Sequence, residues 1–250
     1  MDGATFWVAA VTASVLVGLS KGGLPLIGML AVPVLALAIS PVAAAGLLLP
    51  VYVVSDVFGL WAYRQVFDRR VLAIVLPGAV VGIALGWATA RVVPEAAVTA
   101  LVGGIGVAFA SRLLVRQTAG RMARPARVGP GLFWGLVTGF TSFVSHSGGP
   151  PWQVYTLPLG MPKAVFAGTS TIAFAAINAV KLLPYWHLGQ LSPGNLKLAA
   201  LLFVPASLAV FAGVRLVRWL PERLFFQLVT WTLLAISLKL LWDGGWGLVA

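Results

Sequence analysis

The 250-residue chain contains no cysteine and few charged residues. The absence of cysteine excludes disulfides, thiolate metal sites and thiol catalysis. Charged residues make up 9% of the chain, against about a quarter in a typical soluble domain, whereas 60% of the residues are hydrophobic. Apolar stretches recur from end to end, so the composition leaves no room for a soluble catalytic domain and places the chain in a lipid bilayer.

Acidic residues are the scarcer of the two charge types. Six Asp and Glu stand against 17 Lys and Arg, and the formal net charge is +11. Most of the arginines occur in short segments between apolar stretches, where they indicate membrane topology rather than nucleic-acid binding. We therefore expect the bilayer and a small solute as partners, no nucleic acid, no cofactor and no metal site, while the oligomeric state stays open.

The apolar segments predict an all-α polytopic membrane protein. Six of them are about 20 residues long, the length that crosses ~30 Å of hydrocarbon. Residues 4–20 and 24–39 are shorter, about 16 residues or ~24 Å as helix, and the same holds around residues 145–151. Each of these short pairs is either a re-entrant hairpin or two short spanning helices. The six longer segments are 41–63, 71–90, 95–115, 164–185, 196–217 and 222–242.

Two parts of the chain resemble each other in layout. Gly18-Leu-Ser-Lys-Gly-Gly-Leu-Pro25 has a counterpart in Ser145-His-Ser-Gly-Gly-Pro-Pro151, and Arg-x-x-Pro-Glu occurs at 91–95 and again at 218–222. Internal repeats with Gly/Pro-interrupted apolar segments at matching positions are typical of secondary transporters. We expect a first membrane repeat at 1–115, a basic cytoplasmic linker at 116–130 and a second repeat at 131–250, each with a broken helix pair followed by three transmembrane helices.

The charges of the connecting loops are exchanged between the copies. The loop at 64–70 is basic, but its counterpart at 186–195 has no Lys or Arg, whereas the basic loop of the second copy lies at 215–223. The positive-inside rule places 64–70, 215–223 and the arginine-rich segment 112–127 in the cytoplasm. The exchange predicts two inverted-topology repeats with an odd number of crossings in each.

The two breaks are the expected substrate site. Glycine and proline interrupt a helix, freed backbone N–H groups suit an anion, and Lys21 adds a cation. In the second break, hydroxyl, imidazole and amide groups can orient an oxyanion, and His146 can carry a proton. We expect the two breaks to meet near the membrane midplane. The substrate-binding candidates are Ser20, Lys21, Gly22, Gly23, Ser145, His146, Ser147, Gly148, Gly149 and Gln153.

Three further polar residues lie inside predicted spans. Asn178 and Lys181 are three residues apart and share a helix face. Asp56 lies in a span of the first copy, and charges inside spans normally face a partner or an aqueous cavity. We expect these residues to serve coupling or charge pairing, with Asp56 neutralising either Lys21 or Lys181. Pairing of Asp56 with Lys21 would reduce the positive charge available to a substrate.

These motifs resemble the TauE/SafE sulfite exporter family. The resemblance rests on Gly18 to Pro25, on Leu30-Ala-Val-Pro33, on the duplicated layout and on the repeated Arg-x-x-Pro-Glu, and it covers nearly the whole chain. Ser20-Lys21-Gly22-Gly23 takes the place of the glycine-rich string common in members, whereas the second copy departs further. The resemblance implies a multi-pass permease of the bacterial cytoplasmic (inner) membrane for sulfite, a sulfonate or a related organic anion.

Two other functions compete with a transporter that works by alternating access. A passive anion channel would use the same anion-binding groups. An intramembrane enzyme would need a nucleophile and a base, but His146 and Ser147 are adjacent and no Gly-x-Ser-x-Gly elbow is present. We therefore predict no catalytic residues, and the direction of transport and the coupling ion or proton stay open.

Overall fold

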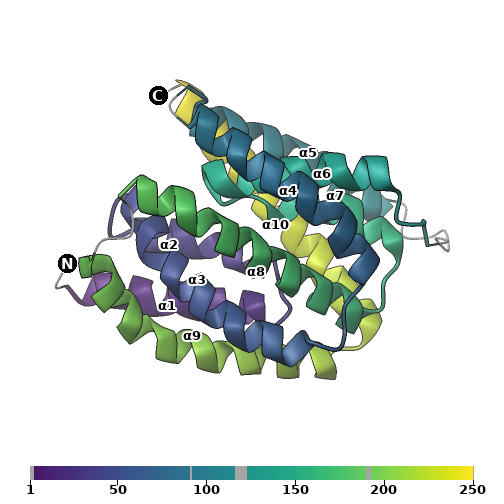
Figure 1. Cartoon of the computed structure of the whole chain (residues 1–250), viewed down its shortest axis with the longest axis horizontal. Helices are drawn as coiled ribbons and strands as arrows, with labels where there is room; N and C mark the ends of the chain where they lie inside the picture. Colours follow the sequence, from purple (N-terminus) through teal and green to yellow (C-terminus); the bar gives the residue numbers. More distant parts are fainter. Residues whose placement is uncertain (1–2, 91, 116–122, 190–192, 250) are drawn as a thin grey trace. The chain divides into compact units, whose positions relative to one another are not determined.

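The computed structural model describes residues 3–90, 92–115, 123–189 and 193–249, and every regular element in these ranges is helical (Figure 1). Seven of the described helices are long and apolar enough to cross a membrane. The prediction of an all-α polytopic membrane protein is confirmed at this level. The elements are α1 (Ala4–Lys21), the 3-10 helix η1 (Ile27–Leu30), α2 (Ala31–Ala36), α3 (Pro41–Tyr63), α4 (Arg69–Thr89), α5 (Glu95–Val115), α6 (Val128–Ser145), α7 (Gly149–Thr156), the 3-10 helix η2 (Leu157–Leu159), α8 (Lys163–His187), α9 (Pro193–Trp219) and α10 (Glu222–Val249).

The six longer apolar segments coincide with α3, α4, α5, α8, α9 and α10. Two of the six, α3 and α5, have the predicted bounds, and α10 is longer than expected because it continues to Val249. The predicted linker 116–130 is partly helical, since α6 starts at Val128, and residues 116–122 lie outside the described ranges.

The two broken pairs are asymmetric, which corrects the expectation of two arms of similar length. The first arm of each pair, α1 or α6, is one helix of 18 residues. The second arm is a short α-helix joined to a 3-10 turn: η1 with α2 after the first break, and α7 with η2 after the second. An α-helix of eight residues spans only ~12 Å, so neither second arm can cross a bilayer as a helix alone. Whether each pair is a re-entrant hairpin or crosses the membrane twice stays a prediction.

The described helices form two compact units that do not follow the two halves of the sequence. Unit 1 contains residues 1–67 and 164–220, and unit 2 contains residues 68–163 and 221–250. Unit 1 therefore joins α1, α2 and α3 to α8 and α9, whereas unit 2 joins α4 and α5 to α6, α7 and α10. Each unit takes helices from both predicted repeats. The division into repeats concerns sequence similarity, and it stays a prediction.

In unit 1, α1 and α9 pack closely and run in the same direction. A Cβ added at Gly18 would meet Ala206, and one added at Gly22 would lie 2.5 Å from the carbonyl oxygen of Val210. Small residues let two helix backbones approach in this way within a membrane. Because Gly18 and Gly22 are one turn apart, as are Ala206 and Val210, the contact continues along both helices.

In unit 2, α4 and α6 make the equivalent contact. Gly82 of α4 lies against the carbonyl of Leu136, and Gly139 of α6 lies against the carbonyl of Ala79. α1, the first helix of the first predicted repeat, thus packs in parallel against α9 of the second repeat. In the same way α6, the first helix of the second predicted repeat, packs in parallel against α4 of the first. This correspondence agrees with an internal duplication. Whether the two copies have inverted topology stays a prediction.

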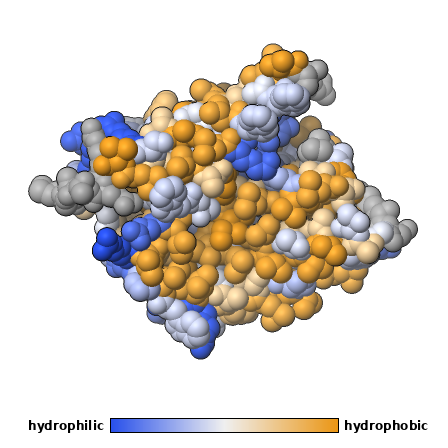
Figure 2. All heavy atoms as spheres, turned by 180° about the vertical axis from the view of Figure 1, so that it is seen from behind, coloured by the Kyte–Doolittle hydropathy of each residue, from blue (hydrophilic) through white to orange (hydrophobic). Residues whose placement is uncertain are grey.

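Large apolar side chains are exposed along the outer surfaces of the helices. Leu201, Val204 and Leu208 of α9 are each more than 60% exposed. Figure 2 shows one face of the molecule, where hydrophobic residues predominate. Exposed apolar area on this scale is unusual for a soluble monomer and suits contact with lipid.

Candidate functional site

The first break is the C-terminal end of α1. The N–H groups of Gly22, Gly23 and Leu24 donate to the carbonyls of Gly18 (2.9 Å), Ser20 (3.2 Å) and Leu19 (3.4 Å). Gly23 has a φ of +110°, which glycine adopts without the steric cost that a side chain would bring. These N–H groups close α1, so the prediction that they bind an anion is not supported at this break. The reason is that a helix ends here, and its spare groups are carbonyls rather than N–H groups.

Side chains from two other helices bind those spare carbonyls. The Tyr63 hydroxyl of α3 donates to the Gly22 carbonyl at 2.7 Å, and the Thr171 hydroxyl of α8 donates to the Lys21 carbonyl at 3.2 Å. Buried carbonyls without a donor would destabilise a membrane protein by several kcal/mol each. These bonds therefore fix the end of α1 between α3 and α8.

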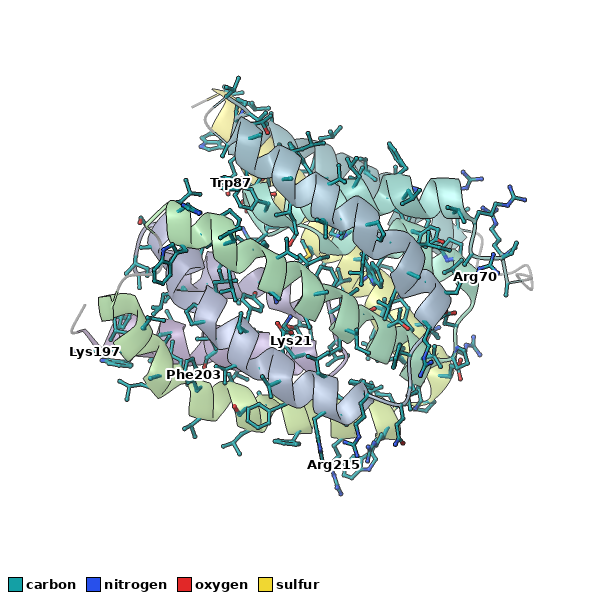
Figure 3. The ribbon with its side chains drawn as sticks, in the orientation of Figure 1. Lys21, Arg70, Trp87, Lys197, Phe203 and Arg215 are labelled. Carbon is teal, nitrogen blue, oxygen red and sulfur yellow. The ribbon has the colours of Figure 1, made fainter. Side chains whose placement is uncertain are left out.

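Lys21 extends from this fixed end into the interior of unit 1 (Figure 3). Its Nζ forms an ion pair of 2.7 Å with Oδ1 of Asp56, and both side chains are almost fully buried. The other carboxylate oxygen of Asp56 accepts a hydrogen bond of 2.8 Å from Nδ2 of Asn178. Of the two alternatives predicted for Asp56, the structure therefore shows pairing with Lys21. One residue from each of α1, α3 and α8 meets in this cluster.

Two tyrosines complete the surroundings of the buried lysines. The Lys21 ammonium lies 5.2 Å from the ring centroid of Tyr52, and the Lys181 ammonium lies 5.4 Å from that of Tyr185. An aromatic ring within about 6 Å stabilises a cation through its quadrupole, and more so where water is excluded. The Tyr52 hydroxyl donates to the Gly28 carbonyl at 2.6 Å, which ties η1 to α3.

The formal charge of this cluster is not balanced. Within the described residues of unit 1, the buried charged side chains are Lys21, Lys181 and Asp56, two cations and one carboxylate. Lys181 is only 1% exposed. A buried net charge is costly in a membrane and normally marks a place where an ion or substrate acts.

The second break has a different local structure. α6 ends at Ser145, and His146 is left-handed with a φ of +51°, the one described non-glycine residue with a positive φ. Histidine is several-fold enriched among the non-glycine residues that adopt such values. The N–H group of Ser147 donates to the Thr141 carbonyl at 3.2 Å. His146 thus has the positive φ that Gly23 has at the first break. The alignment of the two breaks in the sequence had instead paired Gly23 with the glycines that follow His146.

The polar side chains at the second break differ in their hydrogen bonds. The hydroxyl of Ser145 donates to the Thr141 carbonyl, and that of Ser147 donates to the Ser145 carbonyl at 2.9 Å. Gln153 of α7 is fully buried, and neither its amide nitrogen nor its amide oxygen has a hydrogen-bond partner in the described structure. Gly148 and Gly149 lie at the start of α7. Gln153 is therefore the predicted residue of this break whose hydrogen-bonding capacity is clearly unused.

The structure thus brings Lys21, Asp56 and Asn178 together in unit 1, with Lys181 on the same helix as Asn178, whereas the candidates from Ser145 to Gln153 belong to unit 2. The prediction that the two breaks meet concerns both units, and it stays a prediction.

Sequence reasoning missed Tyr52 and the roles of Tyr63 and Thr171. A signal was present on α3, where Tyr52, Asp56, Gly59 and Tyr63 recur at the three- to four-residue spacing of one helix face.

In the described ranges, no group of three or more His, Cys, Asp or Glu residues is arranged to hold a metal ion. A search of curated proteins and a search of solved structures give no significant match. The family profile described as "Sulfite exporter TauE/SafE" matches residues 7–240, which is nearly the whole chain. With this match, the chain belongs to the TauE/SafE sulfite exporter family, a family of membrane transporters.

Proposed function

We propose that this protein is a secondary transporter that moves a small anion, such as sulfite or a sulfonate, across the bacterial cytoplasmic membrane by alternating access. The observation that carries the proposal is the buried cluster of Lys21, Asp56, Asn178 and Lys181 within helices long enough to span a membrane. Membership of a transporter family supports it.

The chemistry of the cluster favours a small anion as substrate. A dehydrated anion at this depth needs a cation and hydrogen-bond donors to offset the loss of its water, and Lys21 and Lys181 supply amino groups there. A sulfonate carries a single charge and three acceptor oxygens. The donors in unit 1 are the ammonium groups of Lys21 and Lys181 and the amide of Asn178, and Ser20 lies one residue before Lys21.

The second break supplies further candidate groups. Gln153 can donate to or accept from a substrate oxygen, since both of its amide atoms lack a partner in the described structure. Ser145, His146 and Ser147 add polar atoms on either side of the turn, and Gly148 and Gly149 shape the start of α7. In alternating access, one part of the protein moves against the other around the substrate. His146 and Asp56 are the candidates for a proton that accompanies the anion.

Flux measurements in proteoliposomes test this proposal. A carrier loaded with unlabelled methanesulfonate on one side should show transient accumulation of labelled methanesulfonate from the other side, whereas a passive anion channel would show none. Lys21→Gln should abolish most of this counterflow. Lys197→Gln is the matched control, because Lys197 is exposed near the start of α9 and its removal costs one positive charge elsewhere in unit 1. Equal flux with both variants would contradict the proposed role of Lys21.

A further inference from the structure

A second cationic site lies at one end of unit 1, apart from the buried cluster. A pocket of about 690 Å³ opens there between the last turns of α3 and α9. Its cationic residues are Arg64, Arg215 and Arg218. Arg64 follows the last residue of α3, and Arg215 and Arg218 lie in the last two turns of α9, in the two basic segments that the charge pattern assigns to the cytoplasm. Their meeting around one pocket agrees with the prediction that both loops lie on the same side of the membrane.

The pocket has no acidic lining residue. Asp56 is the single carboxylate among the described residues of unit 1, and it is buried with Lys21. Arginines at helix C-termini are favoured by the helix dipole and by topology, which explains each of them separately. Neither effect explains why the lining of one pocket takes arginines from two helices and no acidic residue.

Tryptophan rings hold two of the guanidinium groups in place. Arg64 lies 5.0 Å from the ring centroid of Trp61 and donates to the Trp61 carbonyl at 2.9 Å. Arg215 lies 4.4 Å from the ring centroid of Trp219. Stacking leaves the N–H groups at the edge of each guanidinium available for planar recognition of a phosphate. Two of the three guanidinium groups are therefore held at defined positions beside the pocket.

The tryptophans and the apolar lining residues indicate how deep in the membrane the pocket lies. Trp61 and Trp219 are 61% and 70% exposed, and exposed tryptophans at helix ends typically lie at the headgroup level. Phe211 and Val214 line the pocket on the side toward the middle of α9, where Leu208 is exposed as well. An occupant that is anionic at one end and apolar at the other fits this arrangement.

We infer that this pocket binds the phosphodiester headgroup of an anionic phospholipid from the cytoplasmic leaflet, with Arg64 and Arg215 on the phosphate and Phe211 against the acyl chains. The cytoplasmic leaflet carries anionic lipids, and basic pockets between transmembrane helices on that side recognise their headgroups. This inference does not depend on the proposed transport function.

Thermal unfolding of the purified protein tests the inference. Phosphatidylglycerol should raise the unfolding temperature above that in phosphatidylcholine with the same acyl chains, because a ligand that binds only the folded state stabilises it. In Arg64→Gln/Arg215→Gln, the apparent affinity for phosphatidylglycerol should fall about thirtyfold, the loss expected for two arginines at about 1 kcal/mol each. Lys197→Gln should respond as the wild type does.

Three outcomes would overturn the inference. The first is retention of the full phosphatidylglycerol effect in the double variant. The second is an equal effect of inorganic phosphate on the wild type, which would make the pocket a site for soluble anions. The third is no effect of phosphatidylglycerol on the wild type. The unfolding temperature in phosphatidylcholine shows whether the double variant is folded. If the double variant does not fold, Arg215→Gln alone is tested, and its apparent affinity for phosphatidylglycerol should fall about fivefold.

Discussion

The ion pair between Lys21 and Asp56 allows stability and transport to be separated. Lys21→Gln removes the ammonium 2.7 Å from Oδ1 of Asp56 and leaves a carboxylate that is only 6% exposed. Breaking a buried pair by removing one partner costs about 3–5 kcal/mol, because the remaining carboxylate loses the cation that contacts it directly. We expect the free energy of unfolding to fall by about this amount. In Lys21→Gln/Asp56→Asn, the two amides are neutral, and most of that loss should be recovered.

Transport should respond differently from stability. A hydrogen bond to a charged group is worth about 1.5–3 kcal/mol, so loss of the Lys21 ammonium should lower anion flux at least tenfold in both variants. Denaturant unfolding in detergent measures the first effect, and flux per inserted protein in liposomes measures the second. A double variant as unstable as the single one would refute the energetic reasoning. Wild-type flux in the double variant would show that Lys21 is structural and leave Lys181 as the cation of the site.

Three further predictions concern the breaks and the topology. His146→Gly should be more stable than His146→Ala by about 1–2 kcal/mol, because glycine adopts a φ of +51° without the steric cost that a Cβ brings; equal stability of the two would contradict a backbone role, and reduced flux in both would show that the imidazole matters. Tyr63→Phe should lower the free energy of unfolding by about 1–3 kcal/mol, because the buried Gly22 carbonyl loses its 2.7 Å donor; an unchanged denaturation midpoint would count against this. Single cysteines at Val66 and Leu188, both partly exposed, should react with an impermeant reagent from opposite sides of the membrane; labelling from the same side would rule out the exchanged loop topology.

The bounds of the long helices could be predicted from the sequence because hydrocarbon thickness fixes their length. Segments 41–63 and 95–115 show this, since each matches a helix to the residue. The pairing of Asp56 was one of two predicted alternatives, because few charges lie inside the spans and each needs a partner. The structure shows Lys21 buried at the end of α1 and paired with Asp56, and its role in transport stays a prediction.

Other features depend on which helices pack together, which the apolar pattern does not encode. Nearly every face of these helices is hydrophobic, so the pattern could not show that α9 lies along α1 or that α6 lies along α4. The N–H groups after Lys21 were expected to face an anion because the break was interpreted as a helix start. The hydrogen bond from Leu24 back to Leu19 shows that it is a helix end. The left-handed backbone conformation at His146 could not be predicted from the sequence, because the residue there is not a glycine.

The interleaved composition of the two units has a consequence for biosynthesis. α1 leaves the ribosome more than 170 residues before α9, the helix that covers its glycine face, and α4 precedes α6 by about 40 residues. The glycines Gly18 and Gly22 at the end of α1 therefore contact lipid or the insertion machinery, in place of α9, until translation is nearly complete. Unit 1 can close only after the last of its helices has been inserted, so a chain truncated before Pro193 would leave unit 1 without α9, however well its earlier helices enter the membrane.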